Sequence, residues 1–118
     1  MSSSASAALE AYEEAGVHGR IMRTPVGMYA YSKKNGRRGQ LCLVQVFPLR
    51  VQRILRDWPE RRQRRREWST FAIARERVHE AALKRILLRF EARLLLCADG
   101  EGRKPQVMRQ VPLCGGLR

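Results

Sequence analysis

The sequence has few of the residues that build disulfide scaffolds and zinc sites. It contains three cysteines and two histidines. Cys42, Cys97 and Cys114 are odd in number and widely separated, and neither they nor His18 and His79 show the close spacing of zinc ligands. We therefore expect reduced thiols, which are typical of cytoplasmic proteins.

Long hydrophobic runs are also missing. No apolar stretch approaches the roughly 18 residues that a membrane-spanning helix needs. The first six residues lack the basic and apolar regions of a secretory signal, so we expect a cytoplasmic protein that does not enter membranes. A hydrophobic content of 44% is nevertheless ordinary for a folded chain, and 118 residues suit one domain.

Acidic residues are scarce and unevenly placed. The 24 Lys and Arg outnumber the 11 Asp and Glu, which gives a net charge of +13. Residues 1–19 contain three glutamates and no Lys or Arg, so they carry −3 and the remaining 99 residues carry +16. Residues 50–66 alone hold eight arginines against Asp57 and Glu60. Two interpretations remain open here: carboxylates that bind a divalent cation beside arginines that bind phosphate, or a basic segment that binds nucleic acid.

Residue patterns predict an α+β chain. Serines near the start, an alanine-rich stretch and Gly16 indicate a capped helix over 3–16, with Glu10, Glu13 and Glu14 on one side. Asn35-Gly36 is typical of a hairpin turn. Trp58 and Trp68 are expected to anchor the core. The expected strands are 17–24, 26–33, 41–51 and 66–69, with a bulge or edge at Pro48. The expected helices are 71–78 and 81–96. The arginine run is expected to be a loop. Residues 97–118 are expected to form a basic, disordered tail.

The segment Ala8–Val17 resembles the second half of the Nudix box, Arg-Glu-U-x-Glu-Glu-x-Gly-U, in which U is a bulky aliphatic residue. Glu10, Glu13, Glu14, Gly16 and Val17 all match. Downstream, the order of four segments is similar to the order in a bacterial branch of the family, which resembles diphosphoinositol polyphosphate phosphohydrolases. These segments are Gly27–Lys34, Val46–Leu49, Asp57–Glu60 and Arg64–Trp68.

Two departures from the family pattern stand out. The arginine of the box, which helps to hold the adjacent glutamate, is replaced by Leu9. The first half of the box, Gly-x5-Glu, would begin before Met1, as would the preceding strands of the family. The resemblance therefore implies an N-terminally truncated Nudix domain over residues 1–96, with an incomplete α/β/α sandwich around a mixed sheet.

The resemblance implies a hydrolase of a diphosphate bond in a polyphosphate or nucleoside-diphosphate-linked substrate. Glu13 and Glu14 would hold Mg²⁺ or Mn²⁺, and Glu10 would be a further ligand or the base that activates water. Arg61, Arg62, Arg64 and Arg65 would bind substrate phosphates, because guanidinium groups bind phosphate with two hydrogen bonds. The truncation is expected to impair turnover. The alternatives are a basic nucleic-acid-binding protein and a non-catalytic remnant of the family.

Overall fold

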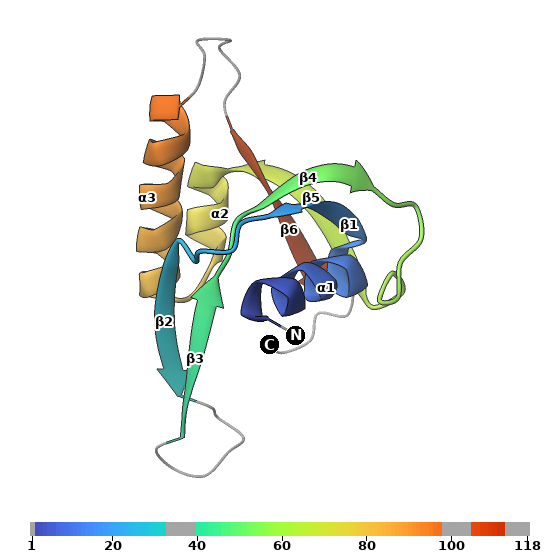
Figure 1. Cartoon of the computed structure of the whole chain (residues 1–118), viewed down its shortest axis with the longest axis horizontal. Helices are drawn as coiled ribbons and strands as arrows, with labels where there is room; N and C mark the ends of the chain where they lie inside the picture. The colour runs from blue at the N-terminus through green and yellow to red at the C-terminus, as the bar shows by residue number, and fades with distance from the viewer. Residues whose placement is uncertain (1, 33–39, 98–104, 113–118) are drawn as a thin grey trace.

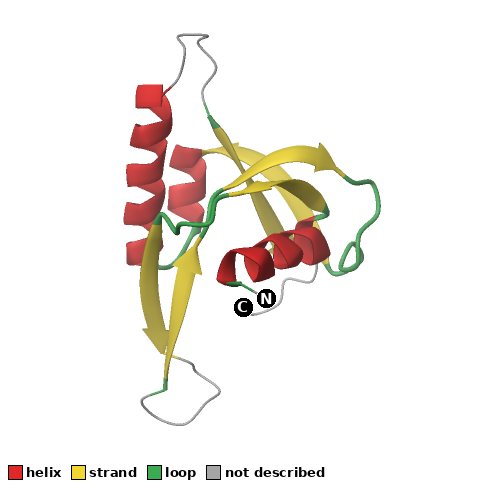
Figure 2. Cartoon of the chain, in the orientation of Figure 1, coloured by secondary structure: helices red, strands yellow, loops and turns green. Residues whose placement is uncertain are grey.

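The computed structural model describes residues 2–32, 40–97 and 105–112, and the predicted turn at Asn35-Gly36 lies outside these ranges. The described chain is an α+β fold, as predicted (Figures 1 and 2). Its elements are α1 (Ser3–Ala15), β1 (Val17–Ile21), β2 (Gly27–Ser32), β3 (Leu41–Val46), β4 (Leu49–Ile54), β5 (Arg64–Thr70), α2 (Phe71–Arg77), α3 (Ala81–Cys97) and β6 (Gln106–Pro112).

Helix α1 begins and ends where its capping residues stand. The Ser2 hydroxyl accepts a hydrogen bond from the Ala5 amide at 3.2 Å, which satisfies one of the free donors of the first turn. Gly16 ends the helix in the left-handed conformation, with φ 62° and ψ 39°, and its amide donates to the Tyr12 carbonyl at 2.9 Å. The predicted helix is confirmed to within one residue.

The strands pair in three separate two-stranded ladders, and each described pairing is antiparallel, so the described residues do not form the mixed sheet that the resemblance implied. Strand β1 pairs with β4, and β2 pairs with β3. The predicted single strand over 41–51 was wrong, because the chain changes partner at Phe47 and Pro48. Proline has no amide hydrogen to continue a ladder. Its carbonyl instead accepts from the Met22 amide at 3.0 Å, which extends the β1 side of the pairing.

Strand β5 changes the interpretation of two further segments. It begins at Arg64, so the second half of the arginine run is a strand rather than the predicted loop. Its partner β6 lies within residues 97–118, which the sequence analysis assigned to a disordered tail. Val107 and Met108 are half-buried in β6. The segment therefore carries apolar side chains that pack near β5, α1 and α2.

The core of the described residues is small. Its buried apolar side chains are Ala15, Val17, Phe71, Ala74 and Ile86. Ile86 lies over Gly27, where an added Cβ would come within 2.6 Å of its side chain, so α3 packs closely on the start of β2. Trp68 was expected in the core but is 43% exposed. No helix in the described ranges is both long and apolar enough to cross a membrane.

Candidate metal and phosphate site at the end of helix α1

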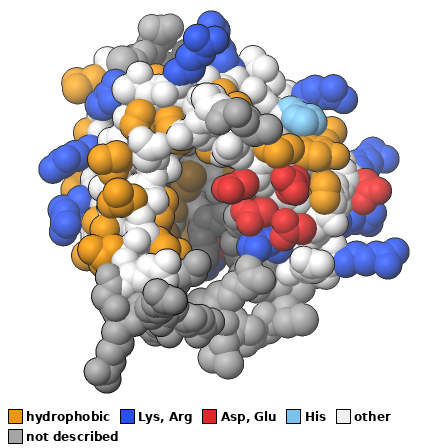
Figure 3. Space-filling model, turned by 60° about the horizontal axis from the view of Figure 1, so that its bottom comes forward, with side chains coloured by type: hydrophobic (Ala, Val, Ile, Leu, Met, Phe, Trp, Pro, Cys, Tyr) orange, Lys and Arg blue, Asp and Glu red, His pale blue; other side chains and the backbone are white. Residues whose placement is uncertain are grey.

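Three glutamates of α1 are the sequence-based candidates for metal ligands. Glu10 is exposed, and Glu13 and Glu14 are half-buried near the end of the helix. Figure 3 shows acidic side chains gathered beside a hollow on this face of the molecule. Within the residues that the structure describes, however, no three His, Cys, Asp or Glu side chains are grouped closely enough to hold a metal ion.

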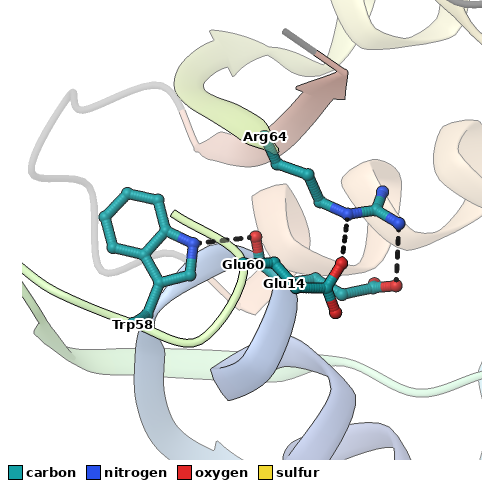
Figure 4. Close-up of polar contacts among 4 residues, drawn as sticks. All are labelled: Glu14, Trp58, Glu60 and Arg64. Carbon is teal, nitrogen blue, oxygen red and sulfur yellow. Dashed lines mark hydrogen bonds and ion pairs between the residues drawn. The ribbon is translucent and has the colours of Figure 1, made fainter. Parts of the chain in front are cut away.

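The Glu14 carboxylate is instead engaged by an arginine. Arg64 Nη2 lies 3.4 Å from Glu14 Oε1, and Arg64 Nε donates to Glu60 Oε1 at 2.8 Å (Figure 4). The Arg64 side chain is only 14% exposed, and the two carboxylate side chains are 29% and 28% exposed. We call these three residues the Arg64 cluster. One guanidinium thus joins the helix carboxylate to a second carboxylate from the turn before β5, leaving a net charge of −1.

Two hydrogen bonds to backbone carbonyls hold this turn against the helix independently of the Arg64 side chain. The indole Nε1 of Trp58 donates to the Glu14 carbonyl at 3.1 Å, and the Glu60 amide donates to the Glu13 carbonyl at 2.9 Å. Both acceptors belong to the last turn of α1, whose carbonyls have no partner within the helix. The turn therefore completes the hydrogen bonding of the helix end and fixes Glu60 beside Glu14.

Arg66 ties the same helix end to strand β5. Its guanidinium donates to the carbonyls of Ala15 at 2.9 Å and Gly16 at 3.2 Å, and to the carbonyl of Leu55. It also lies 4.1 Å from the centre of the Trp58 ring, in a cation–π contact. Burial lowers the pKa of Arg66 from its usual value, but a guanidinium remains charged in proteins. The cation therefore faces the negative end of the helix dipole.

Gly16, which matches the glycine of the box, has two structural reasons to lack a side chain. Its positive φ is unfavourable for other residues. An added Cβ would also lie 2.7 Å from Trp58 and 2.8 Å from Arg66. The glycine thus allows the indole and the guanidinium to pack directly on the end of α1.

The four arginines predicted to bind phosphate are divided by the structure. Arg64 faces α1 and contacts two carboxylates, whereas Arg61, Arg62 and Arg65 are exposed. Arg61 also lies 3.6 Å from Asp57. An open cavity of about 450 Å³ is lined by Asp57, Trp58, Pro59, Arg61, Arg62 and Gln63. Arg61 and Arg62 border this cavity, and Arg65 lies on the opposite side of β5 from the Arg64 cluster.

Sequence reasoning missed Glu60 and Arg66. Once residues 64–70 are recognised as a strand, alternation places Arg64 and Arg66 on one face and Arg65 on the other. That pattern was the available signal, but a run of three arginines conceals it. Glu60 was noted only as part of the segment Asp57–Glu60, and its place beside Glu14 depends on the turn that brings residues 58–60 back to α1.

Comparison with known proteins supports the resemblance to the Nudix family. Over 88 residues the chain is 36% identical to "Nudix hydrolase 12, mitochondrial" of Arabidopsis thaliana. The match covers 71% of this chain and 43% of that protein, so the chain spans less than half of the length of its curated relative. No protein-family model matches the chain, and no solved structure matches it.

Proposed function

We propose that the chain provides the glutamate helix of a Nudix-type hydrolase that cleaves a diphosphate bond with the help of a divalent cation. The observation that carries the proposal is the α1–β1 junction. Glu10, Glu13 and Glu14 lie on a helix that ends at a left-handed Gly16, in the order of the Nudix box. The similarity to a Nudix hydrolase over 88 residues supports it independently.

The donor set suits Mg²⁺ or Mn²⁺ in its chemistry. Both ions prefer oxygen ligands, and carboxylates spaced by three and four residues project from one side of a helix. Glu14 contacts Arg64, so it can coordinate a cation only if that contact is weakened or exchanged. The carboxylates of Glu10 and Glu13 take part in no ion pair among the described residues: Glu13 contacts the turn through its backbone carbonyl, and Glu10 is exposed.

The residues of the chain would have different roles in the proposed hydrolysis. A bound divalent cation would neutralise phosphate charge and lower the pKa of a water ligand. Glu13 and Glu14 would hold the cation, and Glu10 would accept the proton from the attacking water. Arg61 and Arg62 are exposed and can turn toward phosphate oxygens, and Arg64 would join them when it leaves Glu14. Arg65 is exposed on the other face of β5, so it does not lie beside these three.

The finer features of the proposal follow from the resemblance. The substrate is a small phosphorylated compound, either a polyphosphate or a nucleoside-diphosphate-linked molecule, and the chain is assigned to the bacterial branch similar to diphosphoinositol polyphosphate phosphohydrolases. Residues 1–96 form the Nudix-like part of an α/β/α sandwich, which β6 extends by pairing with β5. A cytoplasmic location is proposed from the cysteines, which lack the spacing of disulfide pairs.

Mn²⁺ binding and diphosphate cleavage test the proposal together. Mn²⁺ binding is followed by electron paramagnetic resonance. Cleavage is measured by chromatographic separation of the phosphorylated products over a panel of nucleoside diphosphate sugars, dinucleoside polyphosphates and inositol pyrophosphates. The wild-type chain is expected to bind Mn²⁺, and Glu13→Gln is expected to lose most of that binding. Where hydrolysis is detected, Glu10→Gln is expected to lower it about 10²- to 10⁴-fold, as for loss of a general base.

The matched control is Glu76→Gln, the same change at an exposed glutamate on α2. It is expected to leave Mn²⁺ binding and hydrolysis unchanged, and circular dichroism checks that all variants keep their helix content. A wild-type chain that does not bind Mn²⁺, or binding that Glu13→Gln and Glu76→Gln alter equally, would overturn the proposal.

A further inference from the structure

The β1–β4 ribbon has one polar and strongly basic face. In the antiparallel register, His18 lies opposite Arg53 and Arg20 lies opposite Arg50, and all four side chains are exposed. The pair between them, Gly19 with Val51, and the next pair, Ile21 with Leu49, are half-buried, and the register shifts by one residue of β4 between His18 and Gly19. We call His18, Arg20, Arg50 and Arg53 the outer face of the ribbon. Figure 1 shows the two strands running side by side next to α1.

Arg20, Arg50 and Arg53 of the outer face belong to none of the ion pairs within the described part of the chain. Residues directly opposite each other in an antiparallel pair have Cβ atoms about 5 Å apart, and like charges at that position are destabilising. The fold therefore maintains a repulsive arginine pair that an anion between the two guanidinium groups would relieve.

We propose that the outer face of the ribbon binds the phosphate backbone of double-stranded nucleic acid. Guanidinium groups pair with phosphate oxygens through two hydrogen bonds. A duplex carries one charge per about 1.7 Å of its axis, so the roughly 17 Å length of a five-residue strand faces several phosphates. The major groove of a duplex also admits a two-stranded ribbon. This binding goes beyond the proposed hydrolysis and requires none of the glutamates of α1.

A duplex fits the outer face better than a single strand does. Proteins that bind single strands stack the bases on exposed aromatic rings, and neither β1 nor β4 contains Phe, Tyr or Trp. The phenol ring of Tyr12 lies nearby, but the His18 imidazole stacks on it, with centroids 4.9 Å apart and an interplanar angle of 9°. Anionic membranes are also a poorer fit, because all four side chains of the outer face are polar and none can enter the acyl region.

The test compares two variants that lose the same charge in different places. The ribbon variant is Arg20→Gln/Arg50→Gln/Arg53→Gln, and the control is Arg85→Gln/Arg89→Gln/Arg93→Gln, on exposed positions of α3. Fluorescence anisotropy with a labelled 20-base-pair DNA duplex gives the dissociation constant over a series of salt concentrations. The same protein is titrated with a single strand and with vesicles containing 30% phosphatidylserine.

The ribbon variant is expected to bind the duplex about tenfold or more weakly. Its log–log salt slope should fall by about 2.7, because each phosphate contact contributes about 0.9. The control should keep a slope within about one unit of the wild type. Arg20→Gln alone should lower the slope by about 0.9, which keeps the test valid if the triple variant folds poorly.

Three results would overturn the proposal. Equal losses in the ribbon variant and the control would show that the total charge, and not the ribbon, determines binding. Single-stranded DNA bound more tightly than the duplex would contradict the argument from the missing aromatic rings. Vesicle binding that depends on Arg20, Arg50 and Arg53, without duplex binding, would assign the ribbon to a membrane surface.

Discussion

Replacing Arg66 by alanine is expected to destabilise the fold far more than the same change at its neighbour Arg65. Arg66 donates to three backbone carbonyls and lies over Trp58, whereas Arg65 is exposed on the other side of β5. Both substitutions remove one positive charge, so any general effect of the high net charge is the same in the two variants.

The expected cost follows from the contacts that are lost. A hydrogen bond to a charged group contributes roughly 1.5–3 kcal/mol, and a cation–π contact about 0.5–2 kcal/mol. Because the three carbonyls share one guanidinium and can partly reach water once it is removed, we expect about 3–4 kcal/mol in total rather than the full sum. The free energy of unfolding of such domains is only about 5–15 kcal/mol, so the expected loss is a large fraction of the total stability. Arg65→Ala should change the free energy of unfolding by less than about 0.5 kcal/mol.

Urea unfolding followed by tryptophan fluorescence and circular dichroism measures both variants. Arg66→Lys provides a third point, because a single ammonium keeps the charge but cannot span three carbonyls; about half of the loss is expected. The reasoning would be refuted if Arg66→Ala cost less than 1 kcal/mol, or if Arg65→Ala cost as much as Arg66→Ala.

Two further predictions concern the same region. Gly16→Ala should lower the free energy of unfolding, measured in urea, by about 2–3 kcal/mol. The left-handed backbone accounts for roughly 1–2 kcal/mol, and the close approach of Trp58 and Arg66 accounts for the rest. An unchanged urea midpoint would contradict the packing described. Arg64→Gln should tighten Mn²⁺ binding about three- to tenfold in a paramagnetic resonance titration, because it removes a cation next to Glu14. Weaker binding would contradict this and show that Arg64 holds Glu14 in position for the metal.

Local signals were sufficient for the elements that their own residues specify. The serine cap, the alanine-rich stretch and Gly16 define α1, and the predicted helices 71–78 and 81–96 end within one residue of α2 and α3. The strand predicted over 41–51 has a continuous apolar pattern, but Pro48 divides it between two partners. A pattern along the chain reports burial, and it does not report which strand supplies the hydrogen bonds.

The candidate site shows the same limit. The order of the box residues identified Glu10, Glu13 and Glu14, because their spacing is a property of one helix. Their surroundings depend on residues 44 to 51 positions later in the chain, which no helical pattern contains. Arg64 was therefore predicted to bind phosphate, although its guanidinium lies between two carboxylates. The composition of the arginine run was visible from the sequence, but the division of its members between two faces of β5 was not.

The contacts at the end of α1 also set an order for folding. The carbonyls of Glu13, Glu14, Ala15 and Gly16 accept hydrogen bonds from residues 55–66, which a ribosome synthesises 39 to 51 residues later. A helix of 13 residues is marginal on its own, so we expect its last turn to form fully only when Trp58 and Arg66 pack against it. Contacts at such separations in the sequence carry a cost in loop-closure entropy, and we therefore expect the glutamates near that turn to acquire their final positions in this later step.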